Sequence, residues 1–242
     1  MIIDFHSHLL PGIDDGAVDL TVTKGIIDKQ LSDGVDTIVA TPHYYCEQQS
    51  IDDFIVNRDN AYNKVVDYYS ETNLLMPKII LGAEVYYSHY LNSVTDLRKL
   101  CIQGTDYLML ELPYKEITPA IIDGALNLAD ANGVNLIIAH IERYLRFTSY
   151  KSLLPLLQNG VLGQINCSSI IDSGSTRRKT FKFIKDGYVH ILGSDVHNTS
   201  SRPAYMGEAI KVLSKKFSPS FIAGIMNNAN DVLHNLDIDD IY

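Results

Sequence analysis

The chain has no tryptophan, only three cysteines and no long apolar run. Cys46, Cys101 and Cys167 are too few and too scattered for a disulfide framework or a cysteine-based zinc site. No apolar stretch approaches the roughly 20 residues that span a membrane, and the N-terminus lacks the basic and apolar regions of a secretory signal. We therefore expect a cytoplasmic protein without membrane insertion.

Positive charge is also scarce. The 20 lysines and arginines face 29 aspartates and glutamates, which gives a formal net charge of −9. Nucleic acids and anionic membranes bind to basic faces, so the composition argues against nucleic acid as a partner. An anionic substrate stays compatible with this charge, because metal ions and a few arginines can invert the field locally.

The sequence lacks the machinery of thiol-based tyrosine phosphatases. These enzymes need a cysteine and an arginine six positions apart, with the loop between them cradling phosphate. The positions six after the three cysteines hold Asp52, Tyr107 and Ser173, so this mechanism is excluded. The glycine-rich phosphate loop of nucleotide-dependent phosphoryl transfer is missing as well.

The chain does contain a repeat of short apolar runs, each followed by a longer segment. The runs have four to six residues and lack polar alternation, which is typical of strands buried on both faces of a parallel sheet. The seven runs are Ile2–Phe5, Thr37–Ala40, Lys78–Gly82, Tyr107–Leu112, Asn135–Ala139, Leu162–Ile165 and Val189–Leu192.

Most of the intervening segments have the periodicity and end signals of helices. The expected helices are Val22–Leu31, Pro119–Ala131, Tyr150–Gln158, Arg178–Asp186, Ala204–Lys215 and Pro219–Asn227; the segment Tyr44–Asn73 shows no pattern that ties it to a role. Alternating strands and helices predict right-handed βαβ units. We expect one α/β domain over residues 1–242, a seven-stranded barrel or near-barrel, with an open doubly wound sheet as the alternative.

Ionisable or amide side chains end or directly follow every apolar run. They are His6, His8, His43, Glu84, Glu111, His140, Asn166, Asp195 and His197. Barrel enzymes carry their chemistry at the carboxyl ends of the strands, and residues i and i+2 of a strand point to the same side. Imidazoles and carboxylates without a thiolate suit Mn, Fe or Zn. One metal ion that keeps an open coordination position cannot use this many ligands. We therefore predict two or three ions with a bridging carboxylate.

Two arginines lie close to these residues in the sequence. Arg143 follows His140 by three positions, and Arg202 follows His197 by five. A guanidinium fork fits two oxygens of a phosphate group. Metal ions beside such a clamp predict a phosphate-ester hydrolase, in which a metal-bridging hydroxide attacks phosphorus in line and the cations take up the developing charge.

The same motifs carry a resemblance to a known family. The opening Asp4-Phe-His-Ser-His-Leu-Leu-Pro-Gly-Ile-Asp-Asp-Gly-Ala17 resembles that of the PHP (polymerase and histidinol phosphatase) superfamily. More narrowly, it is similar to the bacterial tyrosine-protein phosphatases of capsule and exopolysaccharide loci, the CpsB/YwqE type. The later motifs agree in order and spacing: Ala-Thr-Pro-His43, Leu-Gly-Ala-Glu84, His140-Ile-Glu-Arg-Tyr144 and Ser-Asp195-Val-His-Asn-x-x-x-Arg-Pro203. The resemblance covers essentially the whole chain.

The resemblance implies a distorted (β/α)7 TIM-like barrel of the PHP type with a trinuclear, usually manganese-loaded site. The implied metal ligands are His6, His8, Asp14, His43, Glu84, Glu111, His140, Asp195 and His197. Arg143 and Arg202 are the implied phosphate-binding residues. The implied substrate is phosphotyrosine on the C-terminal tail of a cognate bacterial tyrosine kinase that regulates polysaccharide export.

Some features depart from this family or leave alternatives open. Tyr44 and Tyr45 follow His43 where a second histidine or another polar residue is expected, and Ala204 replaces a frequent second proline, which bears on substrate preference. A small-molecule phosphatase, such as one for histidinol phosphate, is the enzymatic alternative. An inactive binding module that retains the barrel is the non-enzymatic one.

Several single residues also have two interpretations. Asp14 lies in a turn where aspartate is common for turn chemistry alone. Asp4 either orients a ligand histidine or makes a plain buried hydrogen bond. The run Arg177-Arg178-Lys179 is either a solvated helix start or a dock for an acidic substrate tail. The tyrosines that follow the predicted rim strands either contact an aromatic substrate ring or form a local cluster under a loop: Tyr44, Tyr45, Tyr86, Tyr87 and Tyr90. His89, His190 and His234 are interpreted as structural.

Overall fold

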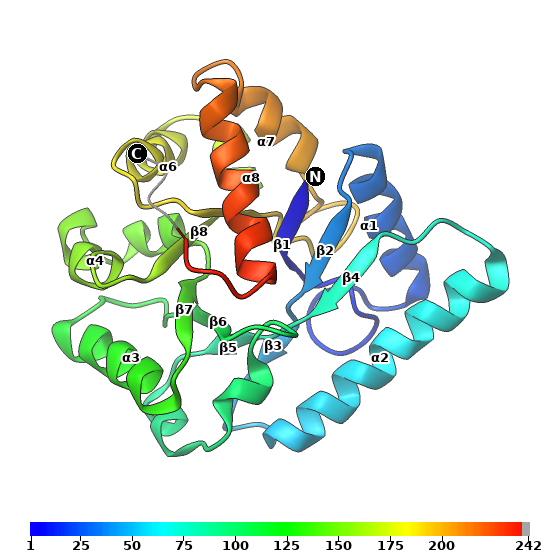
Figure 1. Cartoon of the computed structure of the whole chain (residues 1–242), viewed down its shortest axis with the longest axis horizontal. Helices are drawn as coiled ribbons and strands as arrows, with labels where there is room; N and C mark the ends of the chain where they lie inside the picture. Colours follow the sequence, from blue (N-terminus) through cyan, green and yellow to red (C-terminus); the bar gives the residue numbers. More distant parts are fainter. Residues whose placement is uncertain (239–242) are drawn as a thin grey trace.

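A computed structural model of the chain describes residues 1–238, so the last four residues of the predicted domain lie outside the described part. These residues form an α/β unit whose strand pairs are all parallel (Figure 1). The strands are β1 Ile3–Ser7, β2 Thr37–Ala40, β3 His43–Tyr44, β4 Lys78–Leu81, β5 Glu84–Tyr86, β6 Tyr107–Glu111, β7 Asn135–Ile138, β8 Leu162–Asn166 and β9 Ile191–Gly193. All seven predicted runs contain a strand.

Two of the predicted strands are longer than expected and bent. β2 continues into β3 after Thr41-Pro42, and β4 continues into β5 after Gly82-Ala83. Proline has no N–H to donate to a neighbouring strand, so Pro42 interrupts the hydrogen-bond ladder at the point where β2 passes into β3. The strands consequently group as β1-β2-β4 and β3-β5-β6-β7-β8-β9.

The sheet curls until its last strand lies beside its first. His8 N–H donates to Val196 O at 2.9 Å, and Asp195 N–H donates to His6 O at 2.8 Å. Gly193 allows this approach, because a Cβ built on it would lie 2.5 Å from the Cβ of His6. The curl brings the carboxyl ends of β1 and β9 together.

Helices cover the outside of the sheet. They are α1 Leu20–Ser32, α2 Ile51–Thr72, α3 Pro119–Asn132, α4 Tyr150–Leu157, α5 Cys167–Ile171, α6 Ser175–Lys185, α7 Met206–Leu213 and α8 Pro219–Leu233, with 3-10 turns η1 His89–Ser93, η2 Leu97–Leu100 and η3 Ile141–Arg146. The six expected helices are all present with shifted ends. Within residues 1–238, no helix is both long and apolar enough to span a bilayer.

Helix α2 fills most of the segment that had no assigned pattern. The Ser50 side chain accepts a hydrogen bond from Asp53 N–H and caps its start. Buried residues recur every three or four positions along it, at Ile51, Phe54, Arg58, Ala61, Val65 and Tyr69. This stripe is apolar except for Arg58, and it packs inward, where Phe54 contacts the ring of Tyr44 on β3 at 5.3 Å between centroids. Figure 1 shows α2 along one edge of the molecule.

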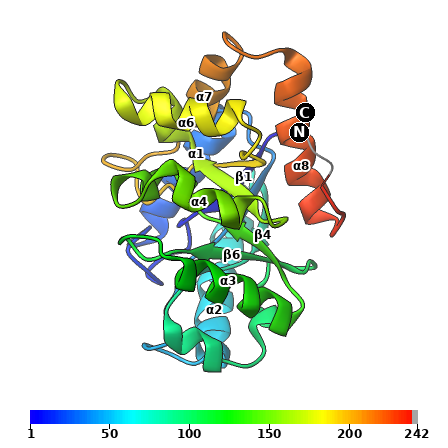
Figure 2. The ribbon, with the colours of Figure 1, turned by 90° about the vertical axis from the view of Figure 1, so that its left-hand side faces the viewer.

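The interior of the curled sheet has two layers. Toward the amino ends of the strands it holds apolar side chains, among them Phe5, Met109 and Ile191, which pack with Ala229 and Val232 of α8. Two residues further along the strands, the same inward face changes to polar residues such as Glu111 and Gln164. Figure 2 shows α8 on one side of the molecule, so the polar layer lies at the end away from α8.

A candidate metal centre at the carboxyl ends of the strands

Eight of the nine predicted ligands lie together in one largely buried group, which contains three clusters. The first cluster comes from the end of β1 and the turn after β9. The Nε2 atoms of His6 and His8 lie 3.1 Å apart. Asp195 Oδ1 lies 3.7 Å from His6 Nε2 and 3.4 Å from His8 Nε2. The i, i+2 spacing therefore aims both imidazoles at one point. Their ligand atoms and that of Asp195 are close enough to hold one cation.

Glu84, the first residue of β5, lies at the middle of the group. Its Oε2 is 3.1 Å from His6 Nε2 and 3.2 Å from both His8 Nε2 and His43 Nδ1. Its Oε1 is 2.8 Å from His140 Nε2. One carboxylate thus reaches four imidazoles that β1, β3 and β7 position, as a bridging ligand would.

A second cluster lies beside Glu84. His43, Glu84 and Glu111 offer ligand atoms within 4.8 Å of one another. Glu111 Oε1 is 3.5 Å from His140 Nε2, so His140 borders the same position. Imidazole nitrogens and carboxylate oxygens at this spacing suit a divalent cation of the first transition row.

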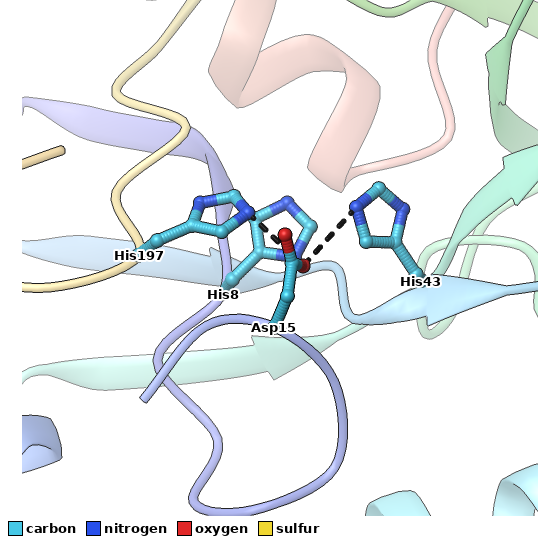
Figure 3. A group of neighbouring side chains, drawn as sticks. All are labelled: His8, Asp15, His43 and His197. Atoms are coloured by element: carbon cyan, nitrogen blue, oxygen red, sulfur yellow. Dashed lines mark ion pairs between the residues drawn. The ribbon is translucent and has the colours of Figure 1, made fainter. Parts of the chain in front are cut away.

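The third cluster contains a residue that the sequence did not single out as a ligand. Asp15 Oδ1 is 3.3 Å from His197 Nε2 and 3.5 Å from His43 Nε2, with His8 behind it (Figure 3). Asp15 is the most exposed member of the cluster and lies in the loop between β1 and α1. The loop therefore closes the group from the solvent side.

Asp14 lies elsewhere than its predicted role as a ligand requires. Its Oδ2 accepts a hydrogen bond from His8 Nδ1 at 2.7 Å and one from His43 N–H at 3.1 Å, while its Oδ1 accepts from Gly16 N–H. Both oxygens are engaged behind the imidazoles. Asp14 fixes the tautomer of His8 with Nε2 toward the cluster, which is the position of an outer carboxylate rather than of a ligand.

Gln164 is a positioning residue that the sequence analysis missed. It is fully buried, and its Oε1 accepts from His6 Nδ1 at 3.1 Å and from His140 N–H at 2.7 Å. Its Nε2 donates to Asn166 Oδ1, and Asn166 Nδ2 donates to Asp195 Oδ2 at 2.8 Å. One amide chain on β8 thereby orients His6, His140 and Asp195.

Asp4 binds the turn after β9 and does not contact a histidine ring within the described residues. Its Oδ1 accepts from Ser194 N–H at 2.7 Å, and its other oxygen accepts from the hydroxyl of Ser194 and the amide of Gln30. This agrees with the interpretation as a plain buried hydrogen-bonding group. Because Ser194 precedes Asp195, the contact still contributes to the placement of a predicted ligand.

The two predicted phosphate-binding arginines meet at Asp195. Arg202 Nη2 lies 2.9 Å from both oxygens of Asp195, and Arg143 Nη2 pairs with Oδ2. Arg143 Nη1 also donates to the hydroxyl of Tyr114 at 3.3 Å. Two guanidinium groups therefore border the clusters on the same side, where they can reach an anion held by the centre.

Two of the predicted ligands have unusual backbone angles. His140 has φ 34° and Asp195 has φ 54°, in the left-handed region that favours glycine. Each residue follows a strand and begins a turn. Non-glycine residues in this region cost free energy that the surrounding contacts must offset, and such residues concentrate at functional sites.

Electrostatics within the group separate the carboxylates. Burial raises the pKa of Glu84, but His6 and the other imidazoles outweigh this and hold it well below its usual range. Burial and repulsion from Glu84 raise the pKa of Glu111 to about 7. Burial together with the neighbouring Arg143 lowers the pKa of His140 to about 4. Burial and the nearby His8 lower the pKa of His197 to about 4.

The residues fit divalent metal ions. Glu84 Oε2, His43 Nδ1 and His197 Nε2 are buried, and each has no hydrogen-bond partner among residues 1–238. Buried polar atoms are normally paired, so ligand atoms without partners at the point of convergence indicate a cation position. The depressed pKa values of His140 and His197 favour the neutral imidazole that metal ligation requires.

Comparison with known proteins identifies the family. The sequence profile described as capsular polysaccharide synthesis, CpsB/CapC, matches residues 2–234. The chain belongs to the CpsB/CapC family. The resemblance that the sequence motifs predicted is thereby confirmed.

Relatives of this CpsB/CapC-family chain are matched over nearly their full lengths. The tyrosine-protein phosphatase CpsB of Streptococcus agalactiae is 27% identical over 248 residues, covering 97% of this chain and 99% of that protein. The tyrosine-protein phosphatase YwqE of Bacillus subtilis is 26% identical over 244 residues, covering 98% and 93%. A solved structure from work on YwqE and Streptococcus pneumoniae CpsB, described as unique metal-dependent tyrosine phosphatases, superposes with a TM-score of 0.86 at 24% identity, covering 98% and 96%.

Tyrosines surround the centre of this CpsB/CapC-family chain in two places. Tyr45 contacts the ring of His43 at 5.4 Å and that of Tyr86 at 5.5 Å between centroids. Tyr114, not singled out in the sequence, lies 6.0 Å from the ring of His140 and is 42% exposed. Tyr44 and Tyr87 are instead buried in the core. The rim tyrosines thus leave aromatic surface beside the clusters, whereas the buried pair serves packing.

The three histidines interpreted as structural contact parts of the fold other than the clusters. His190 Nδ1 accepts a hydrogen bond from Gly163 N–H at 3.0 Å. His234 Nδ1 lies 2.8 Å from Asn230 O at the end of α8, and the ring centroid of His89 lies 3.8 Å from that of Tyr90, with the rings tilted. These contacts lie outside the three clusters.

Proposed function

We propose that this chain is a metal-dependent protein-tyrosine phosphatase built on a distorted (β/α)7 barrel. The observation that carries the proposal is the convergence of His6, His8, Glu84 and Asp195 with Arg143 and Arg202 at one end of the strands. A cation centre beside two guanidinium forks is a site for a phosphate ester. The names of the relatives support tyrosine phosphate as that ester.

The proposed ligands follow the three clusters. They are His6, His8, Asp15, His43, Glu84, Glu111, His140, Asp195 and His197, with Asp15 in place of Asp14. Two or three divalent ions fit this set, with Mn²⁺ favoured and Fe or Zn as alternatives. When loaded, such a centre supplies a nucleophilic hydroxide at neutral pH and neutralises charge on the phosphoryl oxygens.

The chain's own residues bind and orient the substrate. Arg143 and Arg202 can each hold two phosphate oxygens, which fixes the phosphorus for in-line displacement. Gln164 and Asp14 hold the imidazoles rigid from behind, so little reorganisation accompanies the reaction. The leaving phenol has a pKa of about 10, so its departure needs less protonation than that of an alkyl alcohol, and we assign no general acid.

We further propose that the substrate is a phosphotyrosine-bearing tail of a bacterial tyrosine kinase involved in capsule or exopolysaccharide synthesis, and that the chain acts in the cytoplasm. The family description, capsular polysaccharide synthesis, supports this setting. The exposed ring of Tyr114, beside Arg143 and His140, offers a surface for the ring of phosphotyrosine.

The test compares a phosphotyrosine peptide with histidinol phosphate, each with and without a chelator and with Mn²⁺ added back. We expect chelator-sensitive hydrolysis that Mn²⁺ restores and that favours the peptide. Turnover of histidinol phosphate alone would assign the centre to a small-molecule phosphatase. If the metal-loaded chain hydrolyses neither substrate, the result would contradict an enzymatic function and favour a binding module.

A further inference from the structure

Positive charge is concentrated in one part of this acidic chain. Residues 143–216 contain 12 of the 20 lysines and arginines but only four of the 29 aspartates and glutamates. This segment therefore carries a formal excess of eight positive charges, although the whole chain has a net charge of −9. Such asymmetry indicates a surface that attracts anions.

Much of this charge lies around helix α6. We define the α6 face as the cations on α6, the neighbouring η3 and the turn after α7: Arg146, Arg177, Arg178, Lys179, Lys182, Lys185 and Lys216. Within residues 1–238, the ion pairs of these seven cations are confined to that of Lys182 with Asp186. The face therefore retains most of its charge for an external anion.

Several of these cations are held in place by packing. Arg177 and Lys216 lie over the ring of Phe181, at 5.6 Å and 5.4 Å from its centroid. Lys182 lies 4.2 Å from the ring centroid of Tyr150. Lysines of an ordinary solvated helix move freely, whereas cations packed on rings lose less freedom when they bind an anion.

The α6 face is continuous with the metal centre. A polar hollow of about 470 Å³ lies between η3 and α6, and its lining includes Arg143, Arg146 and Lys179. Arg143 also reaches Asp195 of the centre, so one residue belongs to both. Lys179 Nζ donates to Leu145 O at 3.0 Å, which fixes α6 against η3, the turn that carries Arg143 and Arg146.

The lining of this hollow suits an acidic group. Besides the cations, it presents hydroxyls of Ser168, Thr176 and Ser201. Its carboxylates are the buried Glu142, whose Oε1 accepts from the hydroxyl of Ser169, and Asp172, whose Oδ1 accepts from Ser173 N–H. The three cations of the lining outnumber these two groups. Hydroxyl and guanidinium donors at one place recognise carboxylates and phosphates.

We propose that the hollow and the α6 face bind the acidic or additionally phosphorylated residues that flank the scissile phosphotyrosine in an extended peptide. This inference rests on the proposed function. A peptide whose phosphate lies at Arg143 has flanking residues within reach of the hollow, because this arginine lines both. The hollow lies directly beside the centre, which favours the flanks of the substrate over an anionic membrane as its occupant.

Two synthetic phosphotyrosine peptides test the proposal, one with flanking Asp and Glu and one with flanking Asn and Gln. For the wild-type chain we expect kcat/KM for the acidic peptide to exceed that for the neutral peptide on the order of tenfold, mainly through KM. Raising the salt concentration from about 0.05 to 0.5 M should reduce this preference, because the shorter Debye length screens exposed charges.

The variant Arg146→Gln/Lys179→Gln should reduce the acidic-to-neutral ratio to near one. Lys64→Gln/Lys78→Gln removes the same charge from exposed positions on α2 and β4 and should keep the wild-type ratio. Wild-type turnover of both peptides with equal kcat/KM at low salt would overturn the proposal and leave the phosphatase function standing. Turnover of neither peptide would overturn the function itself. Binding of the α6 face to anionic vesicles, with no peptide preference, would also overturn the proposal.

Discussion

The two ends of the curled sheet differ in chemistry although the same strands build both. At the amino ends, the inward side chains of β1, β6 and β9 are Phe5, Met109 and Ile191, and α8 covers them. At the carboxyl ends, the same strands lead to His6, Glu111 and Asp195. The first layer stabilises the fold by burying apolar area, whereas the second layer buries ionisable groups that cost free energy unless partners offset them.

The two layers separate the residues that stabilise the fold from those that form the proposed centre. A buried group of imidazoles and carboxylates is held together by mutual pairing, by the amide chain of Gln164 and, in the proposed loaded state, by cations. Substitutions at the polar end should therefore reduce activity more than stability, and those at the apolar end the reverse.

The largest expected effect is at the polar end. Asp195→Ala or His6→Ala removes a proposed ligand, and we expect turnover of a phosphotyrosine peptide to fall on the order of 10³-fold or more. Circular dichroism should show a folded chain in both variants. Retained turnover in either variant would remove that residue from the proposed centre.

The matching change at the apolar end is Met109→Ala. Met109 is fully buried in the layer beneath the centre, so the variant should lose about 2–5 kcal/mol of unfolding free energy through lost burial and a residual cavity. Urea denaturation measures this loss. Turnover per folded molecule should stay close to wild type, and a hundredfold loss of turnover would show that the two layers are not separable.

An intermediate effect is expected for Gln164→Leu. The variant keeps the volume of the side chain but removes the acceptor for His6 Nδ1 and His140 N–H, so metal affinity or turnover should fall about 10–100-fold. Equilibrium dialysis with Mn²⁺ and peptide kinetics measure the two quantities. Gln103→Leu, at an exposed glutamine, is the control and should change neither.

The smallest expected effect concerns acid stability through Asp14. Burial alone would raise its pKa, but the hydrogen bond and charge of His8 outweigh this and lower it to about 2 from an ordinary value of 3.8. The pair therefore contributes about 2 kcal/mol of stability above pH 3.8, and this is lost as the pH falls through about 2. Urea denaturation of the metal-free chain between pH 5 and 2 should show this loss in the wild type and a shallower one in Asp14→Asn. Equal slopes would contradict the pairing.

Most of the fold could be predicted because the strands are buried on both faces. Seven continuous apolar runs stand out against the segments between them, and each run contains a strand. The additional strands β3 and β5, which follow two of the runs after the breaks at Pro42 and Gly82-Ala83, depend on how the sheet bends. Helix α2 had a readable signal, since buried residues recur from Ile51 to Tyr69 at helical spacing behind a serine cap.

The proposed ligands could be predicted where they lie at the carboxyl end of a strand. His6, His43, Glu84, His140 and Asp195 each close an apolar run, and the fold brings such ends together. The choice between Asp14 and Asp15 was beyond sequence reasoning, because adjacent carboxylates in one turn carry the same signal and only the loop's path separates them. Gln164 lay inside a predicted strand, where its polarity among apolar neighbours was the available clue.

The number of metal ions that the purified chain binds tests the proposed metal centre most directly. Equilibrium dialysis against Mn²⁺, followed by elemental analysis, should find two or three ions per wild-type chain, and fewer in Asp15→Ala if Asp15 completes the third cluster. Wild-type occupancy unchanged by Asp15→Ala would remove that residue alone from the ligand set. A wild-type chain that binds one ion or none would contradict the account, because the convergence of its imidazoles and carboxylates would then have another cause.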